Sequence, residues 1–190
     1  IVHTESLRNL IYPIEWDAII QSVGLPCVLK DSYGGGWRGV YVCRSRDDVI
    51  DAYNKSGLLT MVLQEFIEWQ QYVRCLCSGQ QEVLPIKYDP HQRKYHVEHD
   101  HLSHDLGKRV VDDSLTLVQA LGYDMNSVEW AVRDGVPYAI DFMNPAPDMD
   151  INSLTPVYIN WAIEQMANMS IRLAKNPRPQ LEEMRWSKLF

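Results

Sequence analysis

A lysine followed by a glycine-rich loop is the first feature of this sequence that could carry chemistry. A short apolar run ends at Lys30, and the loop after it contains Gly34, Gly35, Gly36 and Gly39. Glycines have no side chain, so backbone N–H groups in such a loop can approach an anion closely. A lysine on the strand before the loop adds a positive charge. The combination predicts a site for a nucleoside triphosphate.

Other interpretations of the loop make different demands on the sequence around it. Gly34, Gly36 and Gly39 fit the dinucleotide-binding pattern Gly-x-Gly-x-x-Gly, which requires a helix after the loop. Residues 40–43 are β-branched or aromatic in part and favour a strand instead. A Walker A loop would end in Gly-Lys-Ser/Thr, and a protein-kinase loop has its lysine on the strand after the glycines. The interpretation that assigns no function to the loop is a β-hairpin with a flexible glycine turn.

Two carboxylates near the other end of the chain form a second candidate site. Asp134-Gly135 predicts a tight hairpin turn between two apolar runs, and pairing of those strands brings Glu129 close to Asp141. Asn144 follows shortly after. Two carboxylates and an amide oxygen are hard ligands suited to Mg²⁺, which usually takes further ligands from substrate phosphates. A surface hairpin with ordinary polar residues is the alternative.

Together these features resemble the ATP-grasp superfamily over residues 12–175, because the order of its elements matches. The chain looks most similar to carboxylate–amine ligases of the glutathione synthase and ribosomal-protein glutamate ligase type. The resemblance implies an α+β fold in which two α+β subdomains grip ATP between antiparallel sheets. The small subdomain would span residues 12–66, the large one residues 67–176, and residues 177–190 would form a peripheral tail.

The resemblance also implies roles for individual residues. Lys30 would hold the α and β phosphates, and the loop would be a flap over the β and γ phosphates. Lys94 would reach phosphate, since the stretch from Tyr88-Asp89-Pro90 onward is similar to one in D-alanine–D-alanine ligases. Arg38 could stabilise charge on the transferring phosphate. An Arg38 that is simply solvated in the loop is an equal alternative. The hinge that meets adenine would comprise Gln64, Glu65, Phe66, Ile67 and Glu68.

The metal and ribose positions depart from the family pattern. Glu129, Asp141 and Asn144 would be the Mg²⁺ ligands, but two residues separate Asp141 from Asn144 where the family usually has one. This spacing requires a bulge or a different ligand. The family often has glutamate where Gln71 falls, so either Gln71 or Glu68 would bind the ribose. Ser127 stands where an arginine often precedes the first metal carboxylate.

The resemblance implies an ATP-dependent ligase that joins a carboxylate to an amine or thiol through an acylphosphate, with ATP and Mg²⁺ as cofactors. Its substrates would be small-molecule or peptide carboxylates and amines, and a homo-oligomer is a further expectation. Family members carry an N-terminal domain, so a chain that starts at Ile1 is expected to be a fragment and incomplete as an enzyme. A non-catalytic nucleotide-binding module is the main alternative.

Composition narrows the class of protein. The 190 residues are 46% hydrophobic and 23% charged, which predicts a globular protein with a sizeable core. A net charge of −7 argues against a nucleic-acid partner, and no apolar run is long enough to cross a membrane. The four cysteines lie mostly in apolar runs, which favours reduced thiols and a cytoplasmic location.

Four histidines, at positions 96, 99, 101 and 104, lie within nine residues. A zinc-binding protein centred on them is a weaker alternative, because structural zinc usually comes with clearer ligand pairs. A polar loop that contacts the acceptor substrate is the better interpretation. From hydrophobic periodicity and caps, strands are expected near residues 26–30, 38–43, 61–67, 71–78, 81–88 and 95–98, and helices at 13–23, 46–56, 105–121 and 154–175.

Overall fold

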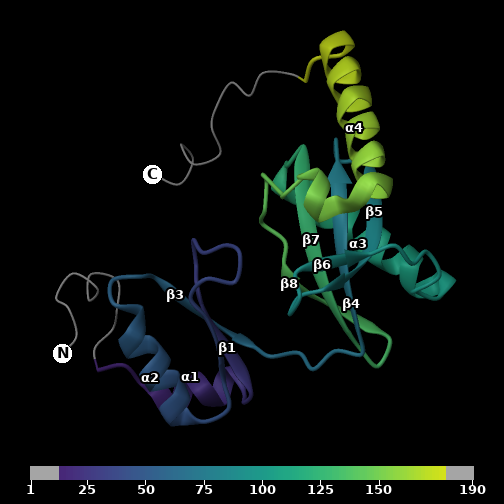
Figure 1. The fold of residues 1–190 in the computed structure, drawn as a ribbon. Coiled ribbons are helices and arrows are strands. Elements are labelled where there is room, and N and C mark those ends of the chain that lie inside the picture. The colour runs from purple at the N-terminus through teal and green to yellow at the C-terminus, as the bar shows by residue number, and fades with distance from the viewer. Residues whose placement is uncertain (1–12, 179–190) are drawn as a thin grey trace. The chain divides into compact units, whose positions relative to one another are not determined.

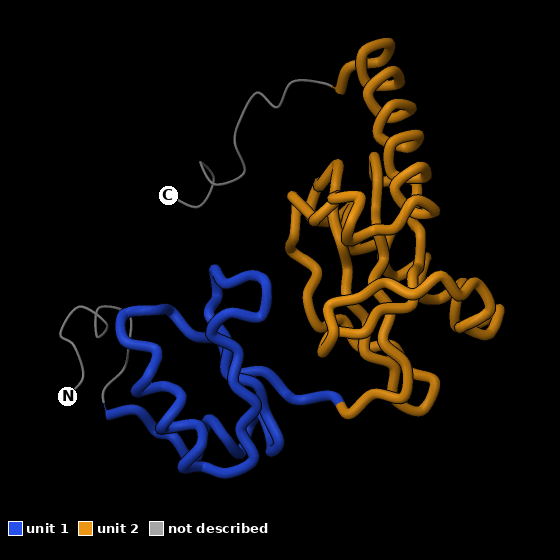
Figure 2. The backbone as a smooth tube through the Cα atoms, in the orientation of Figure 1, with its two compact units in different colours: residues 1–67 blue, residues 68–190 orange. Residues whose placement is uncertain are grey.

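The computed structural model describes residues 13–178, and the chain divides into two compact units between Ile67 and Glu68 (Figure 2). We call them the N-terminal unit and the C-terminal unit and describe each by itself. Almost all of the predicted tail, residues 177–190, lies outside the described residues. No helix among the residues described is long and apolar enough to cross a membrane.

The N-terminal unit contains a three-stranded antiparallel sheet in the order β2-β1-β3 and two helices (Figure 1). β3 is therefore an edge strand. The elements are α1 (Trp16–Val23), β1 (Cys27–Asp31), β2 (Val40–Cys43), α2 (Arg46–Ser56) and β3 (Met61–Glu65).

Alternating residues of β1 build the small core of this unit. Cys27 and Leu29 are buried on one face of the sheet, and they pack with Val49 of α2 and Ile20 of α1. The start of α2 is fixed by a capping box at Ser45. The Ser45 hydroxyl accepts the Asp48 N–H at 3.2 Å, and the Asp48 carboxylate accepts the Ser45 N–H at 3.0 Å. The core and the cap hold the helix against the strand that carries Lys30.

The C-terminal unit contains a five-stranded antiparallel sheet in the order β6-β5-β4-β7-β8. β4 and β7 are central and lie side by side over their whole lengths. The strands are β4 (Gln71–Ser78), β5 (Glu82–Asp89), β6 (Lys94–His96), β7 (Met125–Arg133) and β8 (Val136–Asp141), and the helices are α3 (His104–Leu121) and α4 (Ile151–Lys175).

The two faces of this sheet differ because side chains alternate along each strand. One face presents Cys75 of β4 and Trp130 of β7 to α3, where the Trp130 indole N–H donates to the Ser114 hydroxyl at 2.9 Å. The other face is covered at one end by α4, which contacts β4 and β6. The Tyr158 hydroxyl of α4 donates to the carbonyl of His96 at 2.9 Å. The uncovered part of this second face carries the polar residues described below.

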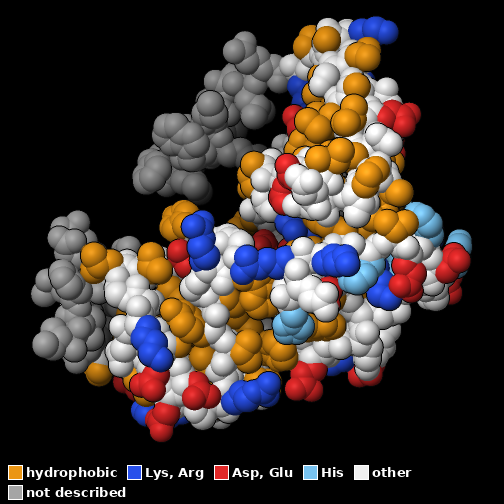
Figure 3. Space-filling model, in the orientation of Figure 1, with side chains coloured by type: hydrophobic (Ala, Val, Ile, Leu, Met, Phe, Trp, Pro, Cys, Tyr) orange, Lys and Arg blue, Asp and Glu red, His pale blue; other side chains and the backbone are white. Residues whose placement is uncertain are grey.

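The outer side of α4 is apolar in part, and hydrophobic atoms gather along this helix in Figure 3. The helix also contains a kink at Thr155, whose φ of 66° is left-handed, just before Pro156. A proline disfavours helical geometry in the residue before it. The exposed apolar residues of α4 are Ile151, Val157, Ile163, Met166 and Ile171.

Most predicted elements are confirmed, and the errors fall at element ends. The helix at 46–56 has the predicted bounds, as does the strand at 71–78. The first helix begins at Trp16 and not at Pro13, and the hinge strand ends at Glu65. The last helix begins at Ile151 and not at residue 154, because Asp150 caps a turn before the kink by accepting the Asn152 N–H at 2.8 Å.

Candidate functional site

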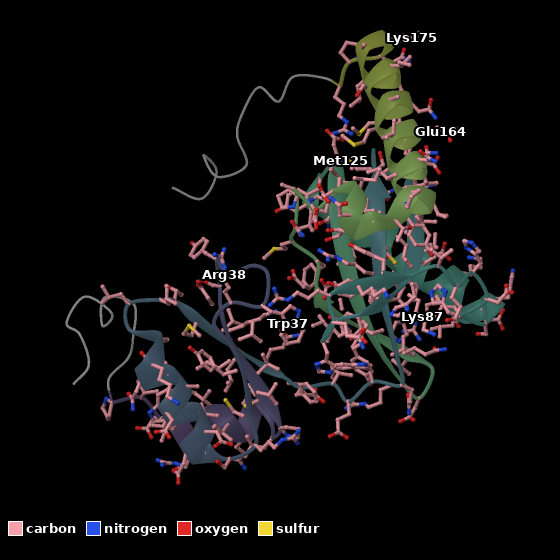
Figure 4. All side chains as sticks on the ribbon, in the orientation of Figure 1. Trp37, Arg38, Lys87, Met125, Glu164 and Lys175 are labelled. Carbon is pink, nitrogen blue, oxygen red and sulfur yellow. The ribbon has the colours of Figure 1, made fainter. Side chains whose placement is uncertain are left out.

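The loop after Lys30 lies between β1 and β2, and Trp37 and Arg38 lie on it (Figure 4). Lys30 pairs with Val40, the first residue of β2 after the loop, so Lys30 lies at the end of the sheet from which the loop extends. Trp37 has a φ of 62°, a conformation that non-glycine residues rarely adopt and that is often found at functional sites.

Short-range hydrogen bonds shape the loop. Asp31 begins it, since its carbonyl accepts the Gly34 N–H at 3.2 Å and its carboxylate accepts the Tyr33 N–H at 3.0 Å. The Arg38 guanidinium donates to the Gly35 carbonyl at 3.5 Å. A Cβ on Gly34 would lie 3.0 Å from the Cβ of Asp31, which is tighter than ordinary van der Waals contact, whereas a Cβ on Gly35 would meet no atom within 4 Å.

The predicted hinge lies along the edge strand β3. Gln64 and Glu65 pair with Val28 and Cys27 of β1, and the Phe66 N–H donates to the carbonyl of Pro26 at 3.1 Å. Backbone groups of an edge strand alternate between the neighbouring strand and the open side. Ile67 and Glu68, the last predicted hinge residues, flank the boundary between the units.

The two predicted metal carboxylates face each other across the β7–β8 hairpin. The turn is Asp134-Gly135, with φ of 53° and 74°, and Glu129 pairs with Asp141. The register shifts between Glu129 and Trp130, so the irregularity lies beside the first carboxylate. This strand pairing brings Glu129 and Asp141 together as the sequence predicts.

Glu129 is nearly buried and has two partners from β4. The Tyr72 hydroxyl donates to Glu129 Oε2 at 2.5 Å, and Arg74 Nε lies 3.4 Å from Glu129 Oε1. Burial and the negative charges of Glu129 and Asp141 raise the pKa of the Tyr72 hydroxyl far above its usual range. Tyr72 therefore stays protonated and acts as the hydrogen-bond donor to Glu129.

Arg74 is a functional candidate that sequence reasoning missed. Its guanidinium donates to the Ser127 hydroxyl at 3.3 Å and lies over the rings of Tyr88 and Tyr95, at 5.2 and 5.7 Å from their centres. Burial lowers the pKa of Arg74, but attraction from Glu129 and the two tyrosines raises it more, so the group stays charged. A lone arginine inside the apolar run 73–77 was the signal that could have found it.

Asn144, the third predicted metal ligand, is hydrogen-bonded to two polar residues of β7. Its side-chain N–H donates to the Ser127 hydroxyl at 3.0 Å, and its backbone N–H donates to Asn126 Oδ1 at 3.0 Å. Asn126 is fully buried and donates to the carbonyl of Phe142 at 2.8 Å. These bonds hold Asn144 despite its unusual spacing, and the amide oxygen is the atom that a cation would use.

The donor set fits Mg²⁺ better than a transition metal. Two carboxylates and an amide supply only oxygen, and Mg²⁺ usually takes its other ligands from water and phosphate. Within residues 13–178, no three or more His, Cys, Asp or Glu side chains are grouped to hold a metal by themselves. The residues therefore fit an ion that arrives with a phosphate-bearing substrate.

Lys94 lies at the start of β6, across the hairpin from Asp89. The Asp89 carboxylate shapes this turn by accepting the N–H groups of His91 and Gln92, both at 2.9 Å. β5 and β4 lie between β6 and β7, so Lys94 and Glu129 are about 14 Å apart across the sheet, and the strand registers offset them further along it. The sheet does not bring Lys94 directly against the two carboxylates.

A cavity of about 470 Å³ lies within the C-terminal unit next to Gln71. Its walls include Trp69, Tyr72, Tyr88, His91 and His101. The ring centres of Trp69 and His91 are 5.6 Å apart, and the Gln71 side chain donates to the carbonyl of His101 at 2.9 Å. Charged side chains, among them Lys87, Asp89 and Glu98, also line the cavity, so its walls combine aromatic rings with many polar groups.

The predicted histidine cluster does not form a metal site. His99 packs edge-on against Tyr158, with ring centres 6.4 Å apart, and His104 Nδ1 lies 3.3 Å from the Asp105 carboxylate. His101 Nδ1 lies 2.7 Å from the carbonyl of Glu98, and burial lowers the pKa of His101. These histidines therefore point to separate partners.

Comparison with known proteins was made by sequence and by structure, and no family model matches the chain. D-alanine–D-alanine ligase from Polynucleobacter asymbioticus is 25% identical over 202 residues, which cover 96% of this chain and 60% of that protein. The chain thus spans about three fifths of the length of this curated relative.

Solved structures agree with the fold over most of the chain. The crystal structure of D-alanine–D-alanine ligase from Bacillus anthracis complexed with ATP has a TM-score of 0.68 at 21% identity, covering 87% of this chain and 57% of that one. A biotin carboxylase–βγ-ATP complex from Campylobacter jejuni has a TM-score of 0.63 at 17% identity, covering 86% and 40%. At these identities the likeness establishes a shared fold.

Proposed function

Because this chain has the ATP-grasp fold, we propose that it binds ATP with Mg²⁺ and activates a carboxylate for ligation to an amine or thiol. The α+β fold class predicted from the sequence is confirmed. The observation that carries the functional proposal is the pairing of Glu129 with Asp141 on adjacent strands of this fold. A solved relative of the same fold is described as complexed with ATP.

The N-terminal unit supplies groups for the triphosphate and the adenine. Lys30 contacts the α and β phosphates, and the backbone N–H groups around Gly34, Gly35 and Gly36 cover the β and γ phosphates. Arg38 faces charge that develops on the transferring phosphate. The backbone of the predicted hinge, residues 64–68, meets the adenine.

The C-terminal unit supplies the cation ligands and the sugar contacts. Glu129, Asp141 and the amide oxygen of Asn144 would hold Mg²⁺, which supplies charge neutralisation for the phosphates when bound. Gln71 or Glu68 binds the ribose beside the aromatic cavity, and Lys94 adds positive charge at the phosphate end.

The reaction follows from positioning and charge, without a protein nucleophile. A substrate carboxylate oxygen attacks the γ phosphorus, the bond to the β-phosphate oxygen breaks, and ADP leaves. The amine or thiol then attacks the carbonyl carbon of the acylphosphate. Inorganic phosphate leaves, and the proton lost by the nucleophile passes to solvent. The chain's residues hold the reacting groups in line and exclude water.

Calorimetric titration with Mg-ATP tests the binding step. We expect Lys30→Ala to weaken ATP binding by about 10- to 100-fold, since a charged hydrogen bond contributes about 1.5–3 kcal/mol. Lys55→Ala is the matched control, because Lys55 lies in the last turn of α2. Equal affinity of wild type and Lys30→Ala, with both folded, would remove Lys30 from the phosphate site.

A non-catalytic nucleotide-binding module is the second candidate. The hydrogen bonds of Asn144 to Ser127 and Asn126 favour it, since they give this residue a structural task that needs no metal. The two candidates differ in turnover. A ligase forms ADP in repeated turnovers only when both a carboxylate and an amine or thiol are supplied, whereas a binding module retains ATP under every such combination.

We also propose a cellular location, a class of substrates and an oligomeric state. Cys27, Cys43, Cys75 and Cys77 are all free and buried, in keeping with a reducing, cytoplasmic location. The substrates would be small-molecule or peptide carboxylates and amines, and the expected homo-oligomer stays a prediction.

A further inference from the structure

A buried positive charge lies directly beside the candidate metal carboxylate. Arg74 is on the central strand β4 and pairs in register with Glu129 of β7. Their side chains are only 13% and 14% exposed, and Arg74 Nε lies 3.4 Å from Glu129 Oε1. The proposed reaction assigns no step to Arg74, and the contacts of its side chain indicate what it does at this point.

The guanidinium is held from several sides. Ser127 accepts one of its N–H groups, and the rings of Tyr88 and Tyr95 lie against it. Asp148 adds a negative charge close enough to interact with Arg74. With these contacts in place, the cation cannot turn away to make room for another positive ion without losing most of its partners.

The Glu129 carboxylate is engaged through both of its oxygens. Oε2 accepts the hydrogen bond from Tyr72, and Oε1 faces Arg74. A carboxylate that bridges two metal ions gives one oxygen to each ion, and the ions in such sites lie about 3.5–4 Å apart. Here the side of Oε1 is already next to a fixed cation, which repels a second divalent ion.

We infer that Arg74 stands in for a second divalent cation, so that the site takes one Mg²⁺ for each bound nucleotide. This inference rests on the proposed nucleotide site and specifies its metal stoichiometry. Arg74 is thus a positioning residue, which acts through Glu129 and through the charge of the site.

Manganese is the probe, because it replaces Mg²⁺ and is paramagnetic. The chain is saturated with a non-hydrolysable ATP analogue and titrated with Mn²⁺, and bound Mn²⁺ is counted by electron paramagnetic resonance. We expect one bound ion in the wild type and an uncoupled spectrum. Arg74→Gln is expected to bind a second ion with the spectrum of a coupled pair, whereas Arg74→Lys keeps the charge and stays at one.

Arg109→Gln is the matched control, since Arg109 forms an ion pair with Asp113 at the same 3.4 Å distance on the exposed surface of α3. A coupled Mn²⁺ pair in the wild type overturns the inference without any variant, which keeps the test decisive should Arg74→Gln fail to fold. A single ion in folded Arg74→Gln also overturns it. Failure of the wild type to bind the nucleotide would instead overturn the proposed function, and this inference with it.

Discussion

The two units carry their candidate site groups in opposite ways. In the N-terminal unit they lie on an exposed loop, shaped by backbone hydrogen bonds around Asp31 and Gly35. In the C-terminal unit Tyr72, Arg74 and Glu129 are packed into the face of a sheet. The N-terminal unit contributes a loop conformation, whereas the C-terminal unit contributes charged side chains that are already held in place. The two units should therefore respond differently to substitution.

The energetic difference follows from burial. Exposed loop residues contribute little to stability, so changes there act mainly on ligand binding. A buried ion pair couples function to folding, because removing one partner leaves the other charge without compensation. The predictions that follow test this contrast, and hydrogen exchange read by mass spectrometry separates the two units wherever stability is measured.

The largest effect is expected from Glu129→Leu. Arg74 would remain buried without its carboxylate partner, which typically costs about 3–5 kcal/mol. We expect faster exchange of the amides of β4 and β7, with exchange in the N-terminal unit unchanged. The double variant with Arg74→Met should recover most of the loss, because replacing both members of a buried pair is often neutral. A double variant as unstable as Glu129→Leu would contradict the coupling.

Gly34→Ala and Gly35→Ala form a matched pair in the loop. The added methyl group at Gly34 would lie 3.0 Å from the Asp31 Cβ, whereas at Gly35 it would meet nothing within 4 Å. We expect Gly34→Ala to distort the loop at a cost of about 1–3 kcal/mol. Nucleotide affinity, measured by calorimetry, should fall in this variant, and Gly35→Ala should stay close to wild type. Equal affinities in the two variants would remove the loop from the nucleotide site.

Ser45→Ala tests whether the N-terminal unit can be destabilised without any change at the site. The substitution removes the hydroxyl that caps α2 and should cost about 1 kcal/mol. Exchange should rise in α2 and stay unchanged in the C-terminal unit. Protection lost equally in both units would show that they unfold together.

Acidification should weaken the C-terminal unit first. Burial lowers the pKa of His101 below its ordinary value of 6.5, so the unfolded chain takes up a proton at higher pH than the folded one. The stability contribution is present above pH 6.5 and is lost as the pH falls below it. His101→Gln should flatten this dependence of hydrogen exchange on pH.

The N-terminal unit should respond only in more acidic solution. Hydrogen bonds from the backbone of Arg44 and the side chain of Ser45 lower the pKa of Asp48 below its ordinary value of 3.8. Its contribution is present above pH 3.8 and is lost as the pH falls through the lower folded value. Loss of α2 protection before that of the C-terminal sheet would contradict the expected order.

The sequence predicted the elements whose signals are local. The helix at 46–56 is flanked directly by its cap, Ser45, and by Gly57, and its bounds are confirmed. The last helix was predicted to start at residue 154, because Pro156 obscured a first turn capped by Asp150. Helix starts beside a proline depend on side-chain caps that periodicity does not reveal.

The carboxylate pair of the candidate site could be predicted because a hairpin turn lies between the two strands that carry it. Asp134-Gly135 is a strong hairpin signal that predicts the pairing of the two strands, and the register shift between Glu129 and Trp130 then sets Glu129 opposite Asp141 instead of Ile140. Arg74 could not be assigned a role in the same way, because its partners come from distant parts of the chain. Only the pairing of β4 with β7 brings it to Glu129 and Ser127.

The contact between Arg74 and the Ser127 hydroxyl has a consequence for sequence searches. The resemblance to ATP-grasp proteins leads one to expect an arginine at position 127, and here a guanidinium from the neighbouring strand reaches that position. At this point of the sheet the positive charge therefore comes from β4 and not from β7, and a search pattern written along β7 alone would pass over it.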